Sequence, residues 1–415
     1  MNTRREDGRS RALFVSHDML WPTIGGGRTR CVKVLMRALR ERAVDLVVVA
    51  PAEDVARDSQ VIPSLPGLRC HVFVDESPPG PAPVRASRPA TDLIRRHVAQ
   101  NGDYDVVHVE GHYLLEVVPP ELHHRTVLAE QNIESQLLEQ RAALGEPVAA
   151  ADVVGLRERE LRAWRRAGAL VTLSAEDEAA VLERDRSLAP RLITNGWDHR
   201  PGPTRPAQDA RGTLTAPRLL FVADYDYAPN RDAFRWLVSE VFPHIRNEIP
   251  GATLVLGGVN LAADLARLGE SCPGVLVTGY VADLDAELDA ADIVLIPLRI
   301  GGGVKLKTIE AIWRARLIVS TTNGGTGVPD PLRAAMCIAD DAKSFAEHAV
   351  RLCRNPAERR RRLAVLTNNR RAAPTWEQTL NQLMGLWSEV AGQAERATGS
   401  APVDAGWSTT TSSVP

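Results

Sequence analysis

The sequence predicts an α/β protein built of two Rossmann-like domains. Its length of 415 residues exceeds what one hydrophobic core usually supports. Short apolar runs alternate with amphipathic helical patterns along most of the chain, which is typical of parallel sheets covered by helices. The stretch 195–213 is rich in Pro, Gly and polar residues, so we interpret it as the linker between two halves of similar size.

The N-terminal domain is expected to span residues 1–200. Its apolar runs of strand length are 12–17, 44–51, 68–74, 105–109, 126–130 and 169–174. A helical pattern runs from about Thr29 to Arg42, and a long charged helix is expected around 134–167. The Pro-rich segment 77–89 is expected to form a surface loop.

The C-terminal domain is expected to span residues 213–373, where the alternation of strand and helix patterns restarts. Its strand candidates are 218–224, 252–258, 274–280, 291–298 and 317–321. Segment 374–392 predicts a final amphipathic helix with large apolar side chains at helical spacing: Trp376, Leu380, Leu383 and Trp387. The polar tail 398–415 is low in complexity and is expected to be disordered.

The composition excludes several classes of function. The formal net charge is -2, so neither nucleic acid nor an anionic membrane surface is an expected partner. The five cysteines form no C-x-x-C pattern, which argues against a zinc site and fits a reducing cytoplasm. The sequence has neither a signal-peptide pattern nor an apolar run of about 18 residues, so no transmembrane segment is expected. The excess of Arg over Lys suggests a GC-rich bacterial origin, and the oligomeric state stays open.

The stretch "PLRIGGGVKLKTIEA", residues 297–311, is the clearest candidate for a binding site. Its glycines 301–303 lie between a strand and a helix, so their backbone N–H groups are exposed without a Cβ in the way. The positive end of the helix dipole and a cation from Lys305 or Lys307 would add to them, which predicts a phosphate or diphosphate site. A Walker A loop does not fit, because Leu306 stands where its second glycine is required.

Glu310 extends this pattern, because it lies three residues after Lys307 on the same face of the helix. A carboxylate there can accept hydrogen bonds from the vicinal hydroxyls of a ribose. Diphosphate beside ribose describes a nucleotide, which in a two-domain protein would lie in the cleft between the domains. A glycine-rich turn with a solvated lysine is the alternative that these residues leave open.

Several segments, taken in order, add a resemblance to a known family. They are "IGGGRTR" (24–30), "LITNGWD" (192–198), "ADYDYAPNRDAFRWLVSEVFPHI" (223–245), "VLVTGYVADLDAELDAADIVLIPL" (275–298), the stretch 297–311 and Trp376. They resemble the retaining nucleotide-sugar glycosyltransferases of the GT-B fold, the large "group 1" family. The resemblance covers most of the chain. It implies two Rossmann-like domains that face each other across a cleft, with a C-terminal helix crossing back to the N-terminal domain.

The resemblance implies a metal-independent sugar transfer, with retention, from a nucleotide sugar to a small-molecule or glycan-precursor acceptor. It implies no cofactor beyond the nucleotide sugar, for which UDP or GDP is the expected nucleotide. The implied donor-binding residues are Gly301, Gly302, Gly303, Lys305, Lys307, Thr308, Glu310, Asn230, Arg231, Gly279, Tyr280 and Val281. The acceptor-binding residues are Gly26, Gly27, Arg28, His112 and Asn132, and the catalytic residues are Gln131, His112 and Lys307.

The chain departs from the family pattern at two positions. Gly302 stands where the family's E-x7-E motif has its first glutamate, so Glu310 is the carboxylate that remains. Gln131 stands where relatives have an active-site histidine. Glutamine can donate a hydrogen bond, but it cannot titrate. Arg231 is a speculative substitute for a phosphate-binding cation that relatives carry early in the second domain.

Two groups of residues could be read as metal sites. D-x-D triplets resemble the metal motif of a different glycosyltransferase fold, and we interpret them as chance: 103–105, 224–226 and 283–285. His108, Glu110 and His112 alternate at a strand end and so share a face, as in a metal trio or an acid/base cluster. One structural histidine with polar contacts to an acceptor is the favoured interpretation, so no metal is expected.

Two alternatives to transfer stay open. An epimerase on the same fold would need acid/base groups around the sugar, and the lack of histidine at position 131 argues against it. A degenerate transferase would bind a nucleotide or a protein partner without turnover, which Gln131 and Gly302 motivate. Intact Lys307 and Glu310 argue against this second alternative.

Overall fold

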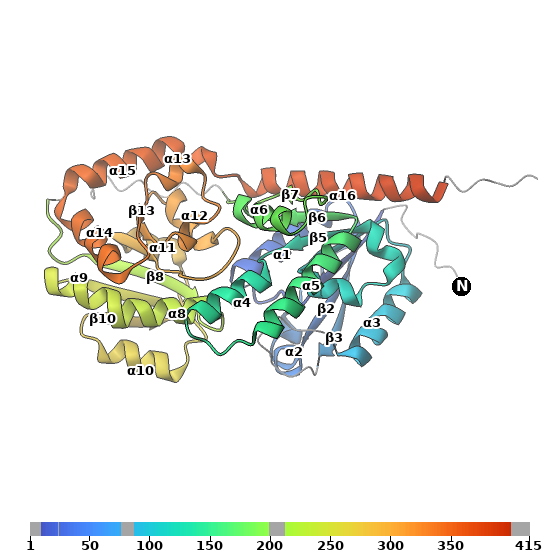
Figure 1. Cartoon of the computed structure of the whole chain (residues 1–415), viewed down its shortest axis with the longest axis horizontal. Helices are drawn as coiled ribbons and strands as arrows, with labels where there is room; N and C mark the ends of the chain where they lie inside the picture. The colour runs from blue at the N-terminus through green and yellow to red at the C-terminus, as the bar shows by residue number, and fades with distance from the viewer. Residues whose placement is uncertain (1–9, 24, 76–86, 199–211, 400–415) are drawn as a thin grey trace, which may run out of the picture.

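The computed structural model describes residues 10–23, 25–75, 87–198 and 212–399. Two parallel sheets lie side by side, each covered by helices (Figure 1). The predicted α/β fold class with two Rossmann-like sheets is confirmed. Of the expected loop 77–89, the expected linker 195–213 and the expected tail 398–415, most residues lie outside the described ranges.

The first sheet has seven strands in the order β3-β2-β1-β4-β5-β6-β7. Its strands are β1 (Arg11–Ser16), β2 (Ala43–Pro51), β3 (Leu68–Asp75), β4 (Val106–Glu110), β5 (Thr126–Glu130), β6 (Ala169–Thr172) and β7 (Arg191–Leu192). Its α-helices are α1 (Gly26–Ala38), α2 (Ala52–Asp58), α3 (Arg88–Asn101), α4 (Glu134–Ala143), α5 (Ala150–Arg166) and α6 (Ala175–Arg184). Its 3-10 helices are η1 (Ser59–Val61), η2 (His112–Val117) and η3 (Pro120–Arg125).

The second sheet has six strands in the order β10-β9-β8-β11-β12-β13. They are β8 (Arg218–Asp224), β9 (Thr253–Val259), β10 (Val275–Gly279), β11 (Ile293–Ile296), β12 (Leu317–Ser320) and β13 (Cys337–Ile338). Its α-helices are α8 (Ala228–Trp236), α9 (Phe242–Glu248), α10 (Ala263–Ser271), α11 (Leu284–Ala290), α12 (Leu306–Trp313), α13 (Asp330–Arg333), α14 (Ala342–Arg354) and α15 (Pro356–Asn369). The π-helix η4 (Leu237–Val241) and the 3-10 helices η5 (Asn323–Gly325) and η6 (Arg370–Ala372) complete it, and α16 (Trp376–Gly399) follows.

The predicted strands all form, with ends that shift by at most a few residues. The edge strands β7 and β13 escaped prediction because two residues are too few to show an apolar pattern. The prediction of a single helix around 134–167 is wrong. The chain breaks between α4 and α5 at 144–149, where Gly145 has φ +88° and Pro147 removes a backbone donor.

The helix α16 crosses back to the N-terminal sheet, as predicted, and lies along it in Figure 1. Leu383 and Trp387 are fully buried in one core with strands β1 and β2. The crossing is fixed where Trp197 pairs with Thr375 and the Trp376 N–H donates to the Trp197 carbonyl oxygen at 3.0 Å. None of the helices in the described part of the chain is long and apolar enough to cross a membrane.

Candidate active site

The candidate site lies where two helix N-termini from different sheets meet. Helix α1 follows β1 and begins at Gly26, three residues earlier than expected, so Gly26 and Gly27 form its first turn. Helix α12 follows β11 and begins at Leu306. A Cβ on Gly26 would lie 3.6 Å from the Leu306 Cδ1, so the two helices touch across the domain boundary. Ligands of parallel α/β sheets bind at this carboxyl edge of the strands.

The amides of the triple glycine donate hydrogen bonds to side chains of the N-terminal domain. The Gly301 N–H donates to Gln140 Oε1 at 2.8 Å, and the Gly302 N–H donates to Asn132 Oδ1 at 3.2 Å. The Gly303 N–H donates to Asp177 Oδ2 at 3.2 Å. The loop therefore presents three adjacent donors to oxygen acceptors of the opposite domain, and backbone donors of this kind can also bind phosphate oxygens.

Two of these positions accept only glycine. Gly301 has φ +120° and Gly303 has φ +62°, which side chains rarely adopt. A Cβ on Gly303 would also lie 2.7 Å from the Gln131 carbonyl oxygen of the opposite domain. The predicted residues Gln131 and Asn132 are thus brought against the triple glycine, although they come from the other sheet.

Lys305 has a different position from the one expected of a donor-binding cation. Its Nζ donates to the carbonyl oxygens of Gly302 and Gly303, both at 2.9 Å, and of Gly301 at 3.3 Å. The side chain therefore folds back and holds the loop from its carbonyl side. Burial lowers the pKa of Lys305 to about 8.

Lys307 and Glu310 share one face of α12, as the spacing predicts. The Lys307 Nζ donates to Asn230 Oδ1 at 2.9 Å and lies 4.7 Å from the centre of the Phe221 ring. Burial lowers the pKa of Lys307 to about 7. Burial also raises the pKa of Glu310 to about 7, and the charge of Lys307 opposes that rise. Near neutral pH both groups are therefore only partly ionised. Such shifted pKa values are typical of side chains that contact a ligand.

Asn230 belongs to this group, whereas two other predicted donor residues turn inward. Asn230 lies in the first turn of α8 and links Lys307 to the Asp224 carbonyl oxygen, to which it donates at 2.6 Å. Thr308 is buried and its hydroxyl donates to the Gly324 carbonyl oxygen at 2.9 Å. Arg231 donates to the carbonyl oxygen of Tyr225 at 3.1 Å, so it holds its own loop.

The residues expected beside the nucleobase lie at the end of β10. Gly279 has φ +69°, and a Cβ there would meet nothing within 4 Å. Tyr280 is 70% exposed, and Val281 packs against Gly257 of β9. This end of β10 is at the edge of the sheet, so a flat ring could lie against its backbone and the Tyr280 side chain.

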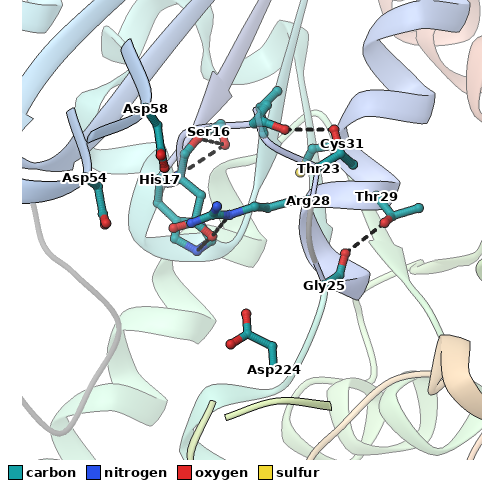
Figure 2. A network of polar contacts seen from close by, with 12 residues as sticks. Ser16, His17, Thr23, Gly25, Arg28, Thr29, Cys31, Asp54, Asp58 and Asp224 are labelled. Carbon is teal, nitrogen blue, oxygen red and sulfur yellow. Dashed lines mark hydrogen bonds and ion pairs between the residues drawn. The ribbon is translucent and has the colours of Figure 1, made fainter. Parts of the chain in front are cut away.

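Arg28 reaches from the first turn of α1 along the wall of the cleft. Its Nε lies 3.8 Å from Asp18 Oδ2. Figure 2 shows Asp58 of α2 on one side of it and Asp224 of the second sheet across the open space. The predicted acceptor-facing cation therefore has acidic neighbours in its own domain, Asp18 and Asp58, while Asp224 of the second domain lies farther away.

His112 pairs with Glu130 and not with the other two members of the predicted trio, so His108 and Glu110 form a pair without it. Gly111 has φ +111° and turns the chain, so the alternation of the strand ends at Glu110. His112 is 3% exposed, and its Nδ1 lies 3.3 Å from Glu130 Oε1. Burial acts to lower the pKa of His112, but the Glu130 carboxylate raises it above its ordinary value.

Sequence reasoning missed the acceptors Gln140 and Asp177, because no short-range motif connects α4 or α6 with the glycine loop. It also missed Asn195, which accepts from Arg30 at 3.1 Å and donates to the Val304 carbonyl oxygen at 3.4 Å. Among the residues that the structure describes, no three His, Cys, Asp or Glu side chains gather in a group that could hold a metal ion.

A sequence model described as "Glycosyl transferases group 1" matches residues 216–355, which form most of the second domain. A Klebsiella pneumoniae protein described as an "Uncharacterized 44.6 kDa protein in cps region" is 26% identical over 144 residues. That match covers 33% of this chain and 37% of the relative, so it spans little more than a third of the relative's length.

Solved structures match over nearly the whole chain at low identity. Anabaena Alr3699/HepE, solved with UDP and glucose, is 15% identical with a TM-score of 0.57 and covers 92% of this chain and 100% of its own. WaaG, a glycosyltransferase of lipopolysaccharide biosynthesis, is 12% identical with a TM-score of 0.63 and covers 89% and 98%. The E. coli trehalose-6-phosphate structure with UDP-2-fluoro glucose is 14% identical with a TM-score of 0.62 and covers 92% and 99%. The second domain thus matches the group 1 glycosyltransferase model, and the whole chain shares the GT-B fold of these solved structures.

Proposed function

We propose that the protein transfers a sugar from a nucleotide sugar to a glycan-precursor or small-molecule acceptor, in the cytoplasm of a bacterium. The arrangement of the glycine loop carries this proposal: three adjacent amides just before α12 donate toward the opposite domain, and Lys307 and Glu310 follow in the helix. The context of two similar proteins supports a glycan role, since one lies in a cps region and WaaG acts in lipopolysaccharide biosynthesis.

Oxygens of the donor diphosphate would replace the side-chain oxygens of Gln140, Asn132 and Asp177 as acceptors for the three amides. Lys307 and the positive end of α12 would then stabilise the negative charge that grows on the leaving diphosphate. Glu310 would accept hydrogen bonds from the ribose hydroxyls. We propose that the reaction needs no metal, because these amides and this cation supply the stabilisation that a metal would otherwise give.

The acceptor would enter on the side of α1, beside Arg28. Retention of the anomeric configuration is part of the proposal and rests on the family resemblance. Gln131 faces the donor loop but cannot take a proton, so no protein nucleophile or general base is assigned to it. The acceptor hydroxyl would pass its proton to an oxygen of the leaving diphosphate.

Calorimetric titration with UDP, GDP, ADP and dTDP, in the presence of EDTA, tests the donor site. Tight binding of one nucleotide without metal is the expected result, and UDP is the first candidate because Alr3699/HepE was solved with UDP. Slow hydrolysis of the matching nucleotide sugar would then show catalysis without a known acceptor. The anomeric configuration of the released sugar, followed by NMR, reports retention. Binding without hydrolysis or transfer would favour the degenerate transferase.

The inward-facing Thr308 gives a prediction that separates packing from ligand contact. Thr308→Val should lower the free energy of unfolding by about 1 kcal/mol, because the Gly324 carbonyl oxygen loses its donor. Nucleotide affinity should stay within about twofold, since the hydroxyl does not face the cleft. Denaturant unfolding and calorimetry measure the two effects. A large loss of nucleotide affinity with an unchanged free energy of unfolding would instead indicate that Thr308 contacts the donor.

Proton uptake should accompany diphosphate binding above neutral pH. The pKa of Lys307 is lowered to about 7 by burial, so at pH 8 the amine is mostly uncharged. A bound diphosphate favours the charged form and raises this pKa, so pyrophosphate affinity should fall as the pH rises from 7 to 9. Calorimetry at pH 8 in two buffers of different ionisation enthalpy should give different apparent enthalpies. Equal enthalpies in both buffers would contradict the assignment.

A further inference from the structure

A buried chain of hydrogen bonds runs from the crossover helix α16 to Gln131, beside the first turn of α1. The Trp387 Nε1–H donates to His108 Nδ1 at 3.2 Å, and His108 Nε2 lies 2.9 Å from Glu110 Oε1. The other carboxylate oxygen, Glu110 Oε2, accepts from Gln131 Nε2 at 3.2 Å. Trp387 and His108 are fully buried and Glu110 is 1% exposed. The proposed reaction uses none of the first three side chains directly.

The donor groups in this network determine the direction of each hydrogen bond. An indole N–H can only donate, so His108 Nδ1 must accept and the imidazole proton must sit on Nε2. That proton is donated to Glu110 Oε1, which also lies 3.4 Å from Arg30 Nε. Burial acts to raise the pKa of the Glu110 carboxyl. The Arg30 charge and the donors of His108 and Gln131 outweigh burial, so this pKa lies below its ordinary value.

An ionised carboxylate can only accept, so it decides which end of the Gln131 amide faces it. The amide nitrogen turns to Glu110, and the carbonyl oxygen Oε1 turns to the first turn of α1. A Cβ on Gly27 would lie 2.6 Å from Gln131 Oε1, which places this oxygen against the first turn of α1. Beside the N-terminus of α1 the side chain thereby presents a hydrogen-bond acceptor with no proton of its own.

We propose that Gln131 accepts a hydrogen bond from a hydroxyl of the bound sugar or acceptor, and that Trp387, His108 and Glu110 are positioning residues that hold its amide in this orientation. The inference rests on the proposed transfer reaction for its ligand. Histidine in the same place would give one ring N–H to Glu110 and present its other nitrogen. Glutamine therefore keeps the acceptor and loses only the ability to take a proton.

This assignment gives α16 a part in the site. The helix arrives from the second domain, and the residue before it, Thr375, pairs with Trp197 at the end of the N-terminal domain. Its Trp387 ring packs 5.3 Å from the His108 ring, centre to centre. The orientation of Gln131 thus depends on correct docking of a helix that sequence analysis treats as packing alone.

Amide NMR and donor hydrolysis test the positioning chain together. The Gln131 side-chain amide signals are assigned by their loss in Gln131→Met. In Glu110→Gln these signals should shift, and the kcat of donor hydrolysis should fall about tenfold, while the Kd of the nucleotide stays within about twofold. Trp387→Phe keeps the ring but removes the N–H, so it should shift the same signals with a kcat loss of about threefold.

The matched control is Trp376→Phe, the same substitution in the first turn of the same helix. It should leave the Gln131 signals and kcat unchanged. The double variant Glu110→Gln/Gln131→Met should be no slower than Gln131→Met alone, because Glu110 acts through Gln131. Additive losses, or unshifted Gln131 signals in both folded Glu110→Gln and Trp387→Phe, would overturn the proposal.

The NMR measurement and the hydrolysis assay distinguish a failure of this proposal from a failure of the proposed transfer reaction. If the unaltered protein hydrolyses no nucleotide sugar, the proposed function fails, but the NMR arm still decides whether the chain orients Gln131. Shifted signals would then support the positioning network by itself. Should Glu110→Gln fail to fold with Arg30 left unpaired, Trp387→Phe carries the same test, because it alters no charge.

Discussion

Lys307→Ala is expected to weaken nucleoside diphosphate binding by about 1.5–3 kcal/mol, which is roughly a 10- to 150-fold rise in Kd. Lys307 lies in the first turn of α12 and is held by Asn230 above the Phe221 ring. It is the cation of the glycine loop whose Nζ is not committed to the loop carbonyl oxygens. Its removal takes away a charge-assisted contact that the backbone amides cannot replace.

Two further variants separate charge from packing. Lys307→Met keeps the apolar stem against Phe221, so it should lose as much affinity as Lys307→Ala with less effect on stability. Lys343→Ala removes an exposed lysine of α14 and should leave the affinity unchanged. Calorimetry with the preferred nucleotide and a denaturant titration of each variant give the result. Unchanged affinity in a folded Lys307→Ala protein would refute the assigned role of the loop.

The roles of the two loop lysines show what spacing can and cannot predict. Both Lys305 and Lys307 follow the triple glycine, and the pattern alone leaves open which one faces a ligand. The difference arises from their positions relative to the helix start. Lys305 is the N-cap residue of α12 and can reach back to the loop carbonyl oxygens, whereas Lys307 is already helical and projects toward α8.

The strands were predictable because parallel strands are buried on both faces and read as continuous apolar runs. The failure at His112 has the opposite cause. Its place on the strand face follows from alternation, and alternation stops where Gly111 adopts φ +111°. The acceptors Gln140 and Asp177 could not be predicted at all, because their contact with the glycine loop depends on how two separate sheets are placed.

These acceptors bear on how the donor would bind. The amides of the triple glycine already donate to side-chain oxygens in this structure. The binding free energy of a diphosphate therefore includes only the difference between its hydrogen bonds to these amides and those of the side chains. Asp177 adds a specific cost, since a carboxylate beside a diphosphate is repulsive. Burial raises the pKa of Asp177, which eases this repulsion. A bound diphosphate would therefore have to displace these side-chain oxygens, because the same amides cannot hold both sets of oxygens.

Glu310→Gln should distinguish the ribose from the diphosphate. The variant is expected to lose about 1.5–3 kcal/mol of nucleoside diphosphate affinity, because a carboxylate that accepts from two hydroxyls is replaced by a neutral amide. Pyrophosphate lacks the ribose, so it should lose much less affinity for the variant than the nucleoside diphosphate does. The control is Glu347→Gln, which changes an exposed glutamate of α14.

Comparing the nucleoside diphosphate with pyrophosphate also corrects for the effect of the Glu310 substitution on Lys307. Loss of the Glu310 charge removes a group that raises the pKa of Lys307, so the lysine carries less charge at neutral pH. That effect weakens both ligands alike, because both place phosphate beside Lys307. The ratio of the two losses, measured by calorimetry at pH 7, therefore isolates the ribose contact. Equal losses for both ligands would remove Glu310 from the ribose and leave it as the charge partner of Lys307.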